Sequence, residues 1–208
     1  TTSKETANHL DLKSVTTYPI EKSLKGLSVE FIESEIKNIN VAKSTIELEN
    51  NSITYDYLVL ALGSETNFFN IPGLQEKALE LKSFYDAIKI RDAVWEMVES
   101  TAQNETVDIV IGGAGSTGVE LAGEIQEWLS QLKKEGYGCR TSVTLIDAAP
   151  DILSSFDPQI VKIASQRLKK LGTSILTEEK IEKVGARIVP LLELSKENPS
   201  GKNIRIMG

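Results

Sequence analysis

The chain has 208 residues, 40% of them hydrophobic and 25% charged, which is typical of a globular protein with one or two domains. Its 23 basic and 30 acidic residues give a net charge of −7, so it lacks the basic surface that binds nucleic acid. No apolar run approaches the ~20 residues that span a bilayer. Cys139 is the single cysteine, which excludes an intrachain disulfide, a CxxC redox pair and a cysteine-based zinc site.

Short β segments are predicted in the first third of the chain, after a polar stretch over residues 1–14. Residues Ile20–Leu24 form one or two helical turns at most, ended by Gly26. Alternating and β-branched residues then predict strands, with polar turn residues between them. The strands expected of this antiparallel meander are Leu27–Ile32, Ile36–Val41, Thr45–Leu48 and Ile53–Tyr55.

The stretch Tyr55–Ser64 contains the apolar run Tyr57–Ala61, which predicts a strand covered on both faces. Gly63 follows the strand, at the end where open α/β sheets bind ligands. Two interpretations remain open from the residues alone: close approach of a ligand, or a plain buried strand with a turn glycine.

A helix is predicted to begin near Ser83, after the turn Asn70–Gly73. Asp86 lies three residues beyond Ser83, as in a capping box. The helical period assigns its apolar face to Phe84, Ala87, Ile88, Arg91, Val94 and Val98.

The most informative stretch is Val107–Gly118, in which an apolar strand leads directly into the glycine-rich motif Gly113-Ala114-Gly115-Ser116-Thr117-Gly118. Gly113 permits the tight turn, Gly115 permits a diphosphate to approach the backbone, and Gly118 permits close packing of the following helix. The free N–H groups of the first helical turn then face the phosphate charge.

A GxGxxG motif alone also fits a turn that binds nothing, and its context favours dinucleotide binding. The next segment has apolar or small residues at helical spacing, and a second strand, Ser142–Ile146, ends on Asp147. A carboxylate in that position hydrogen-bonds a ribose hydroxyl. Asp147 lies farther beyond the glycines than the usual ~20 residues, because a longer helix and the loop Lys133–Arg140 intervene.

A third strand completes the pattern. Asp157 and Pro158 are typical of a helix start, and Gly172 is typical of a helix end. Residues Thr173–Thr177 then predict a strand, which gives an α/β fold of the Rossmann type with a parallel sheet. Beyond Lys180 the pattern is weak, with an apolar run, a turn and a short strand at Asn203–Met207.

The order and spacing of these stretches resemble the type II NADH dehydrogenases of the pyridine nucleotide–disulfide oxidoreductase superfamily. The resemblance rests on Tyr55–Ser64, Ile71–Gly73, Gly113–Glu124 and Val143–Leu153, and it covers residues 19–177. It implies hydride transfer from NADH to FAD and then electron transfer to quinone. Residues 1–74 would be part of an FAD-binding domain containing the meander, 75–185 the NAD(H)-binding domain, and 186–208 a return segment of uncertain fold.

The resemblance also implies the roles of individual residues. Residues Gly113–Gly118 and Asp147 would bind NAD(H), Ala61 and Gly63 would lie at the flavin, and Glu120 would act at the nicotinamide–flavin junction. No metal site is expected. The implied partners of the full-length protein are a quinone as electron acceptor, a membrane surface to which it attaches peripherally, and a second copy of the chain in a homodimer. The implied location is the cytoplasm or the cytoplasmic face of the membrane.

The first FAD glycine loop of that family, its later Gly-Asp strand and its membrane anchor do not occur in these 208 residues. A fragment, inactive on its own, is therefore expected. Other flavin-dependent NAD(P)H reductases or oxidases and sulfide:quinone reductases remain alternatives, as does a non-catalytic dinucleotide-binding module. The single Cys139, away from both nucleotide motifs, argues against sulfide chemistry.

Overall fold

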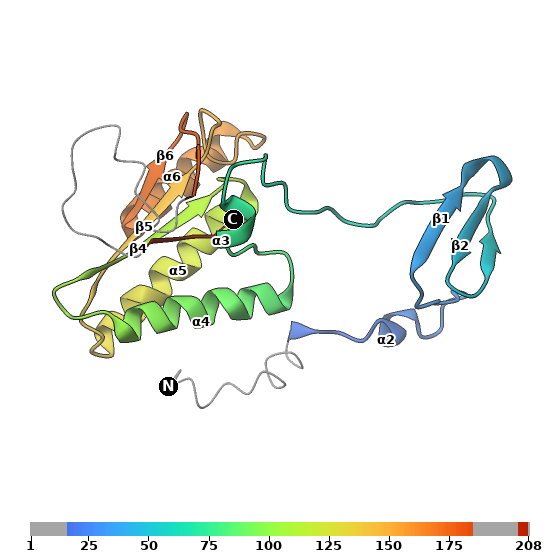
Figure 1. The fold of residues 1–208 in the computed structure, drawn as a ribbon, viewed down its shortest axis with the longest axis horizontal. Helices are drawn as coiled ribbons and strands as arrows, with labels where there is room; N and C mark the ends of the chain where they lie inside the picture. The colour runs from blue at the N-terminus through green and yellow to red at the C-terminus, as the bar shows by residue number, and fades with distance from the viewer. Residues whose placement is uncertain (1–15, 185–203, 208) are drawn as a thin grey trace. The chain divides into compact units, whose positions relative to one another are not determined.

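The computed structural model describes residues 16–184 and 204–207 of the chain. The chain divides into two compact units, unit 1 (Thr1–Ser64) and unit 2 (Glu65–Gly208). Figure 1 labels most of their helices and strands. This division falls at residue 64 rather than at residue 74, and Thr66, Asn67, Phe68, Phe69 and Ile71 of unit 2 line a cavity together with Gly113 of the glycine motif. The assignment of flavin and NAD(H) domains to these units stays a prediction.

Unit 1 is built around a small antiparallel sheet of order β1-β2-β3. Ile39 faces Ile46 across one pair of strands, and Ile46 faces Ile53 across the other, so the apolar residues lie in register. Three of the four strands predicted for the meander are therefore confirmed. The elements of this unit are α2 (Ile20–Leu24), β1 (Ile36–Asn40), the 3₁₀ turn η1 (Val41–Lys43), β2 (Thr45–Leu48) and β3 (Ser52–Thr54).

Two further strands predicted in this part of the chain are absent. Residues 27–32 and 57–61 lie in neither helix nor strand. The second segment is also not buried, since Tyr57 is 95% and Val59 85% exposed. An apolar run reports a preference for burial, whereas a strand also needs a neighbouring backbone to bond. In the described residues of unit 1, sheet pairing involves β1, β2 and β3 alone.

Unit 2 contains a parallel sheet of order β6-β5-β4-β7, the arrangement of one Rossmann half with a fourth strand at its edge. The predicted strand–helix–strand–helix–strand pattern is confirmed, and the short C-terminal strand also forms. The elements are α3 (Leu74–Lys77), α4 (Phe84–Ser100), β4 (Thr106–Gly112), α5 (Ser116–Lys134), β5 (Arg140–Ile146), α6 (Pro158–Leu171), β6 (Thr173–Leu176) and β7 (Ile204–Met207). The apolar run and turn predicted within 186–201 lie outside the described residues.

The core of unit 2 lies mainly against one face of this sheet. Alternate residues of β4, such as Ile109 and Ile111, are fully buried, and those between them are half-buried. In β5, Leu145 is fully buried and Ile146 beside it is also buried. Helices α5 and α6 pack on the strands and on each other. The predicted inner face of α5 is confirmed by buried Ala122, Ile125, Leu129 and Leu132. This packing holds α5 in a fixed position relative to the glycine motif, which joins β4 to the start of α5.

Helix α4 begins at a capping box, as predicted. The Ser83 N–H donates to Asp86 Oδ2 at 2.9 Å, and the Asp86 N–H donates to Ser83 Oγ at 3.3 Å. The predicted apolar face is partly wrong, because Ala87 is exposed and Ile90, Ala93 and Met97 are buried instead. Apolar residues recur at helical spacing on two neighbouring faces of α4, so the period alone does not tell which face is buried. The face that contacts the core is the buried one.

The capping carboxylate predicts a pH-dependent contribution to stability. Hydrogen bonding from Ser83, followed by that from Lys89, lowers the pKa of Asp86 to about 2. A lowered folded-state pKa stabilises the fold above the ordinary value near 4, and this contribution disappears as the pH falls toward 2. Asp86→Asn is expected to reduce the free energy of unfolding at pH 7 by about 1–2 kcal/mol.

Urea unfolding at several pH values checks this expectation. The difference between wild type and Asp86→Asn should shrink between pH 4 and pH 2. Asp92→Asn is the matched control on the same helix, because Asp92 forms only a partly exposed ion pair with Arg91. Equal stabilities of wild type and Asp86→Asn at pH 7 would contradict the assigned role.

The turn at Pro72–Gly73 contacts the backbone of Val184. The Val184 N–H donates to the Pro72 carbonyl at 2.8 Å, and Lys77 Nζ donates to the Val184 carbonyl at 3.3 Å. Gly73 has φ +77°, and a Cβ on it would lie 2.2 Å from the Val184 oxygen. Glycine is therefore required here for both its conformation and its size.

No helix in residues 16–184 combines the length and the apolarity needed to cross a bilayer.

Candidate functional site at the carboxyl ends of the parallel strands

The glycine motif forms a tight turn between β4 and α5. Gly113 has φ +98°, and its N–H donates to the Ile146 carbonyl at 2.8 Å, which ties the turn to the end of β5. A Cβ on Gly118 would lie 1.9 Å from the Gly113 carbonyl oxygen and 3.5 Å from Leu145 Cδ1. The turn and the first helical turn of α5 are therefore in direct contact, and only glycine fits at position 118.

Gly115 has the opposite surroundings. A Cβ built on it would meet no heavy atom within 4 Å, and Gly115, Ser116 and Thr117 are all exposed. Gly115 is the N-cap of α5, and no side chain caps the helix. The first-turn N–H groups thus face open space at the positive end of the helix dipole, which is where anions bind.

Asp147 lies at this turn, directly after β5. Its Oδ2 accepts a hydrogen bond from the Ala114 N–H at 2.5 Å, and its Oδ1 accepts one from the Ala149 N–H at 2.7 Å. The carboxylate therefore contacts the glycine motif itself. The predicted nucleotide ligands Gly113–Gly118 and Asp147 come together in one place.

A cavity of about 630 Å³ opens at the carboxyl ends of β4 and β5. Gly113 and Asp147 line it, together with Phe68, Phe69 and Lys180. Sequence reasoning missed the last three residues. Phe68 and Phe69 are far from the motif along the chain, and Lys180 follows the predicted strand Thr173–Thr177 in a region without a clear pattern.

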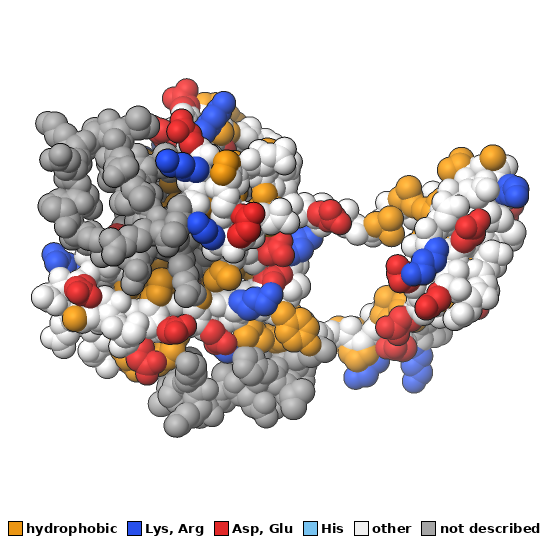
Figure 2. Space-filling model, in the orientation of Figure 1, with side chains coloured by type: hydrophobic (Ala, Val, Ile, Leu, Met, Phe, Trp, Pro, Cys, Tyr) orange, Lys and Arg blue, Asp and Glu red, His pale blue; other side chains and the backbone are white. Residues whose placement is uncertain are grey.

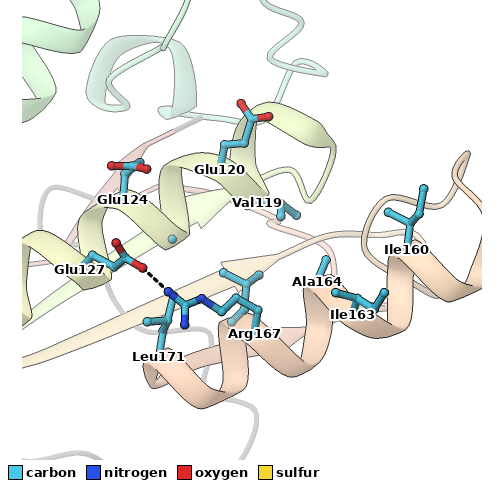
Figure 3. Close-up of a pocket in the computed structure, with 11 residues that line it drawn as sticks. Val119, Glu120, Glu124, Glu127, Ile160, Ile163, Ala164, Arg167 and Leu171 are labelled. Atoms are coloured by element: carbon cyan, nitrogen blue, oxygen red, sulfur yellow. Dashed lines mark hydrogen bonds and ion pairs between the residues drawn. The ribbon is translucent and has the colours of Figure 1, made fainter.

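Glu120 lies elsewhere, on the exposed surface of α5. It lines a groove of about 420 Å³ between α5 and α6 (Figure 3). Glu124 and Glu127 follow on the same helix, Glu127 forms an ion pair with Arg167, and apolar side chains of α6 such as Ile163 form the opposite wall. The side chain predicted to be catalytic is therefore not among those that line the cavity at Asp147.

The predicted flavin residues Ala61 and Gly63 belong to unit 1. Both are exposed and lie in the coil after residue 57, and Gly63 has φ +76°. Figure 2 shows hydrophobic side chains on the surface in both units. In unit 1 these include Tyr57, Val59 and Leu62.

Cys139 is buried beneath α4, where its thiol contacts the Val98 carbonyl at 3.8 Å. Burial raises the pKa of this thiol. A raised pKa disfavours the reactive thiolate, so Cys139 has neither the exposure nor the ionisation expected of a redox nucleophile.

Comparison with known proteins matches residues 3–205 to the family model described as pyridine nucleotide-disulphide oxidoreductase. A type II NADH:quinone oxidoreductase of Staphylococcus haemolyticus is 32% identical over 175 residues, which are 80% of this chain and 42% of that protein. The mitochondrial external alternative NAD(P)H-ubiquinone oxidoreductase B2 of Arabidopsis thaliana is 30% identical over 186 residues, which are 78% of this chain and 32% of that protein.

Solved structures agree on the fold. NDH2 from Plasmodium falciparum in complex with NADH has a TM-score of 0.65 at 23% identity, covering 85% of this chain and 40% of that one. The sulfide:quinone oxidoreductase of Aquifex aeolicus has a TM-score of 0.64 at 15% identity, covering 86% of this chain and 42% of that one. The chain thus spans less than half the length of each of these proteins.

Proposed function

Because the chain belongs to the pyridine nucleotide-disulphide oxidoreductase family, we propose that it is the NADH-binding portion of a type II NADH:quinone oxidoreductase. One observation carries the proposal: the Asp147 carboxylate is hydrogen-bonded to the glycine motif at the mouth of a cavity. The resemblance to NADH:quinone oxidoreductases of bacteria and mitochondria supports the choice of substrates.

The residues at the strand ends fit a dinucleotide. A diphosphate would lie against the N–H groups of the exposed residues Gly115, Ser116 and Thr117, where a Cβ on Gly115 would meet no other atom and no side chain caps the helix. Each oxygen of Asp147 accepts one N–H and has a second lone pair for a ribose hydroxyl. A 2′-phosphate would meet the negative charge of that carboxylate, so the site is expected to prefer NADH to NADPH.

The flavin belongs to the longer protein. Ala61 and Gly63 lie in an exposed coil, and the described residues around them do not fit a bound FAD by themselves. In the complete enzyme, FAD would serve as the acceptor of a hydride from NADH and as the electron donor to a quinone. We assign Ala61 and Gly63 to the flavin side and Glu120 to the region where the nicotinamide approaches it.

The quinone, the attachment to a membrane surface and a homodimer remain part of this proposal for the full-length protein. A sulfide:quinone reductase is a weaker candidate, since the lone Cys139 is buried and its pKa is raised. A dinucleotide-binding module without turnover is the alternative for the 208 residues alone. Flavin absorbance that co-purifies with the chain, together with NADH oxidation, would favour an active enzyme over such a module.

Isothermal titration calorimetry of the 208-residue chain tests the proposal. NADH is expected to bind, and NADPH to bind at least roughly tenfold more weakly, which corresponds to about 1.4 kcal/mol. Failure to bind NADH would contradict the proposed function. Equal or tighter binding of NADPH would contradict only the role assigned to Asp147 and not the proposed function.

A further inference from the structure

The segment between β5 and α6 forms two hydrogen bonds to the backbone of the glycine motif. The Asp147 carboxylate accepts the Ala114 N–H, and the Leu153 N–H donates to the Ala114 carbonyl at 2.8 Å. Ala114 is 2% exposed, so both polar groups of this residue are bonded inside the protein. We propose that Leu153 is a positioning residue that orients the Gly115 N–H toward the diphosphate of the nucleotide, an inference that rests on the proposed function.

Peptide geometry links the Leu153 contact to the ligand. The Ala114 carbonyl and the Gly115 N–H belong to one planar trans peptide, so they point in opposite directions. Leu153 holds that carbonyl on the inner side. The Gly115 N–H is therefore turned to the outer side, where a Cβ on Gly115 would meet nothing within 4 Å.

The preceding peptide is oriented in the same way. Asp147 holds the Ala114 N–H, so the Gly113 carbonyl of that peptide points away from Asp147. Its oxygen lies 1.9 Å from the place of a Cβ on Gly118, at the first turn of α5. Asp147 and Leu153 thus fix two successive peptides of the motif before any nucleotide binds.

Leu153 makes its contact from an uncommon backbone conformation. Its φ is +51°, in the left-handed region, which is unfavourable for a leucine. Burial holds it there, since Leu153 is 7% and the neighbouring Ile152 1% exposed. The segment is also bonded beyond this point, because the Phe156 N–H donates to the Leu153 carbonyl at 2.8 Å.

Three substitutions separate the backbone role of Leu153 from its side-chain packing. Leu153→Ile keeps the volume and apolarity but is β-branched, which strongly disfavours a positive φ. Leu153→Gly loses the side chain and adopts the left-handed backbone freely. Leu153→Met is the control, because it is unbranched at Cβ and of similar size.

Binding of NADH and of adenosine, which has no diphosphate, is measured by calorimetry for each variant well below its unfolding temperature. Leu153→Ile is expected to weaken NADH binding roughly five- to tenfold and adenosine binding less than twofold. Leu153→Met should bind NADH within about twofold of wild type, and Leu153→Gly should bind it more tightly than Leu153→Ile despite lower stability. A packing role alone would make Leu153→Gly the weakest binder, which would overturn the inference.

Amide hydrogen exchange without ligand provides a second readout. The Ala114 and Leu153 amides should be protected in wild type and Leu153→Met, and the Leu153 amide should exchange faster in Leu153→Ile. Unchanged protection or unchanged NADH affinity in Leu153→Ile would overturn the inference while leaving the proposed function intact. Absence of NADH binding by wild type would instead overturn the proposed function and, with it, the role at the diphosphate.

Discussion

Gly118→Ala is expected to abolish measurable NADH binding and to lower the free energy of unfolding by about 2–4 kcal/mol. The new Cβ would lie 1.9 Å from the Gly113 carbonyl oxygen, a backbone atom that cannot rotate away as a flexible side chain could. Either the glycine turn or the first turn of α5 must move. Both carry the N–H groups proposed to face the diphosphate. Calorimetry with NADH and urea unfolding give the two values.

Gly123→Ala is the matched control for this substitution, on the same helix. A Cβ at Gly123 would meet only Leu168 Cδ2, at 4.0 Å. Alanine in a helix interior is favoured over glycine by roughly 0.5–1 kcal/mol, so this variant should be as stable as wild type or more stable. It should bind NADH as wild type does. If Gly118→Ala bound NADH as tightly as wild type, the close contact between positions 113 and 118 would not be required for nucleotide binding.

Asp147→Asn is expected to weaken NADH binding roughly tenfold or more and to narrow the preference for NADH over NADPH. Both carboxylate oxygens accept backbone N–H groups, one from Ala114 and one from Ala149. An asparagine has a single oxygen acceptor, so one of these N–H groups would face the amide NH₂. Leaving a donor without an acceptor costs about 1–3 kcal/mol, and removal of the charge removes the repulsion of a 2′-phosphate.

Titration of Asp147→Asn with both nucleotides checks this expectation. Asp151→Asn is the control, since it makes the same change of charge at an exposed position of the same segment. It should leave the affinities for both nucleotides within about twofold of wild type, because surface substitutions have small effects. A loss of NADH affinity as large in Asp151→Asn would mean that net charge, rather than the contacts of Asp147, governs binding.

The parts of the site predicted from the sequence are those whose chemistry is local. Position 113 requires glycine because its φ is positive, and position 118 requires glycine because a Cβ there would contact the Gly113 carbonyl oxygen, five positions earlier in the chain. Each requirement restricts the residue type at its own position. Asp147 follows its strand directly, so its place at the strand end follows once the strand is recognised. The capping box at Ser83 is equally local and was equally predictable.

The failures concern properties that depend on a partner. Tyr57–Ala61 has the composition of a buried strand, yet the described residues provide no strand beside it and no cover for its side chains. The buried face of α4 is selected by its contact with the core, and two periodic faces compete. Leu153 has a positive φ that nothing in its residue type indicates, because leucine rarely adopts it. Its bond to Ala114 becomes visible only in three dimensions.

The contact of Pro72 and Gly73 with Val184 closes a long loop of the chain. Lys77 and Val184 are 107 positions apart in the chain but are hydrogen-bonded to each other. After β6 the backbone therefore returns to the turn that precedes α4, and β7 lies farther along the chain. The elements from α4 to β6 are thus enclosed between two segments that are bonded to each other. A residue bulkier than glycine at position 73 would push these two segments apart, because its Cβ would lie 2.2 Å from the Val184 oxygen.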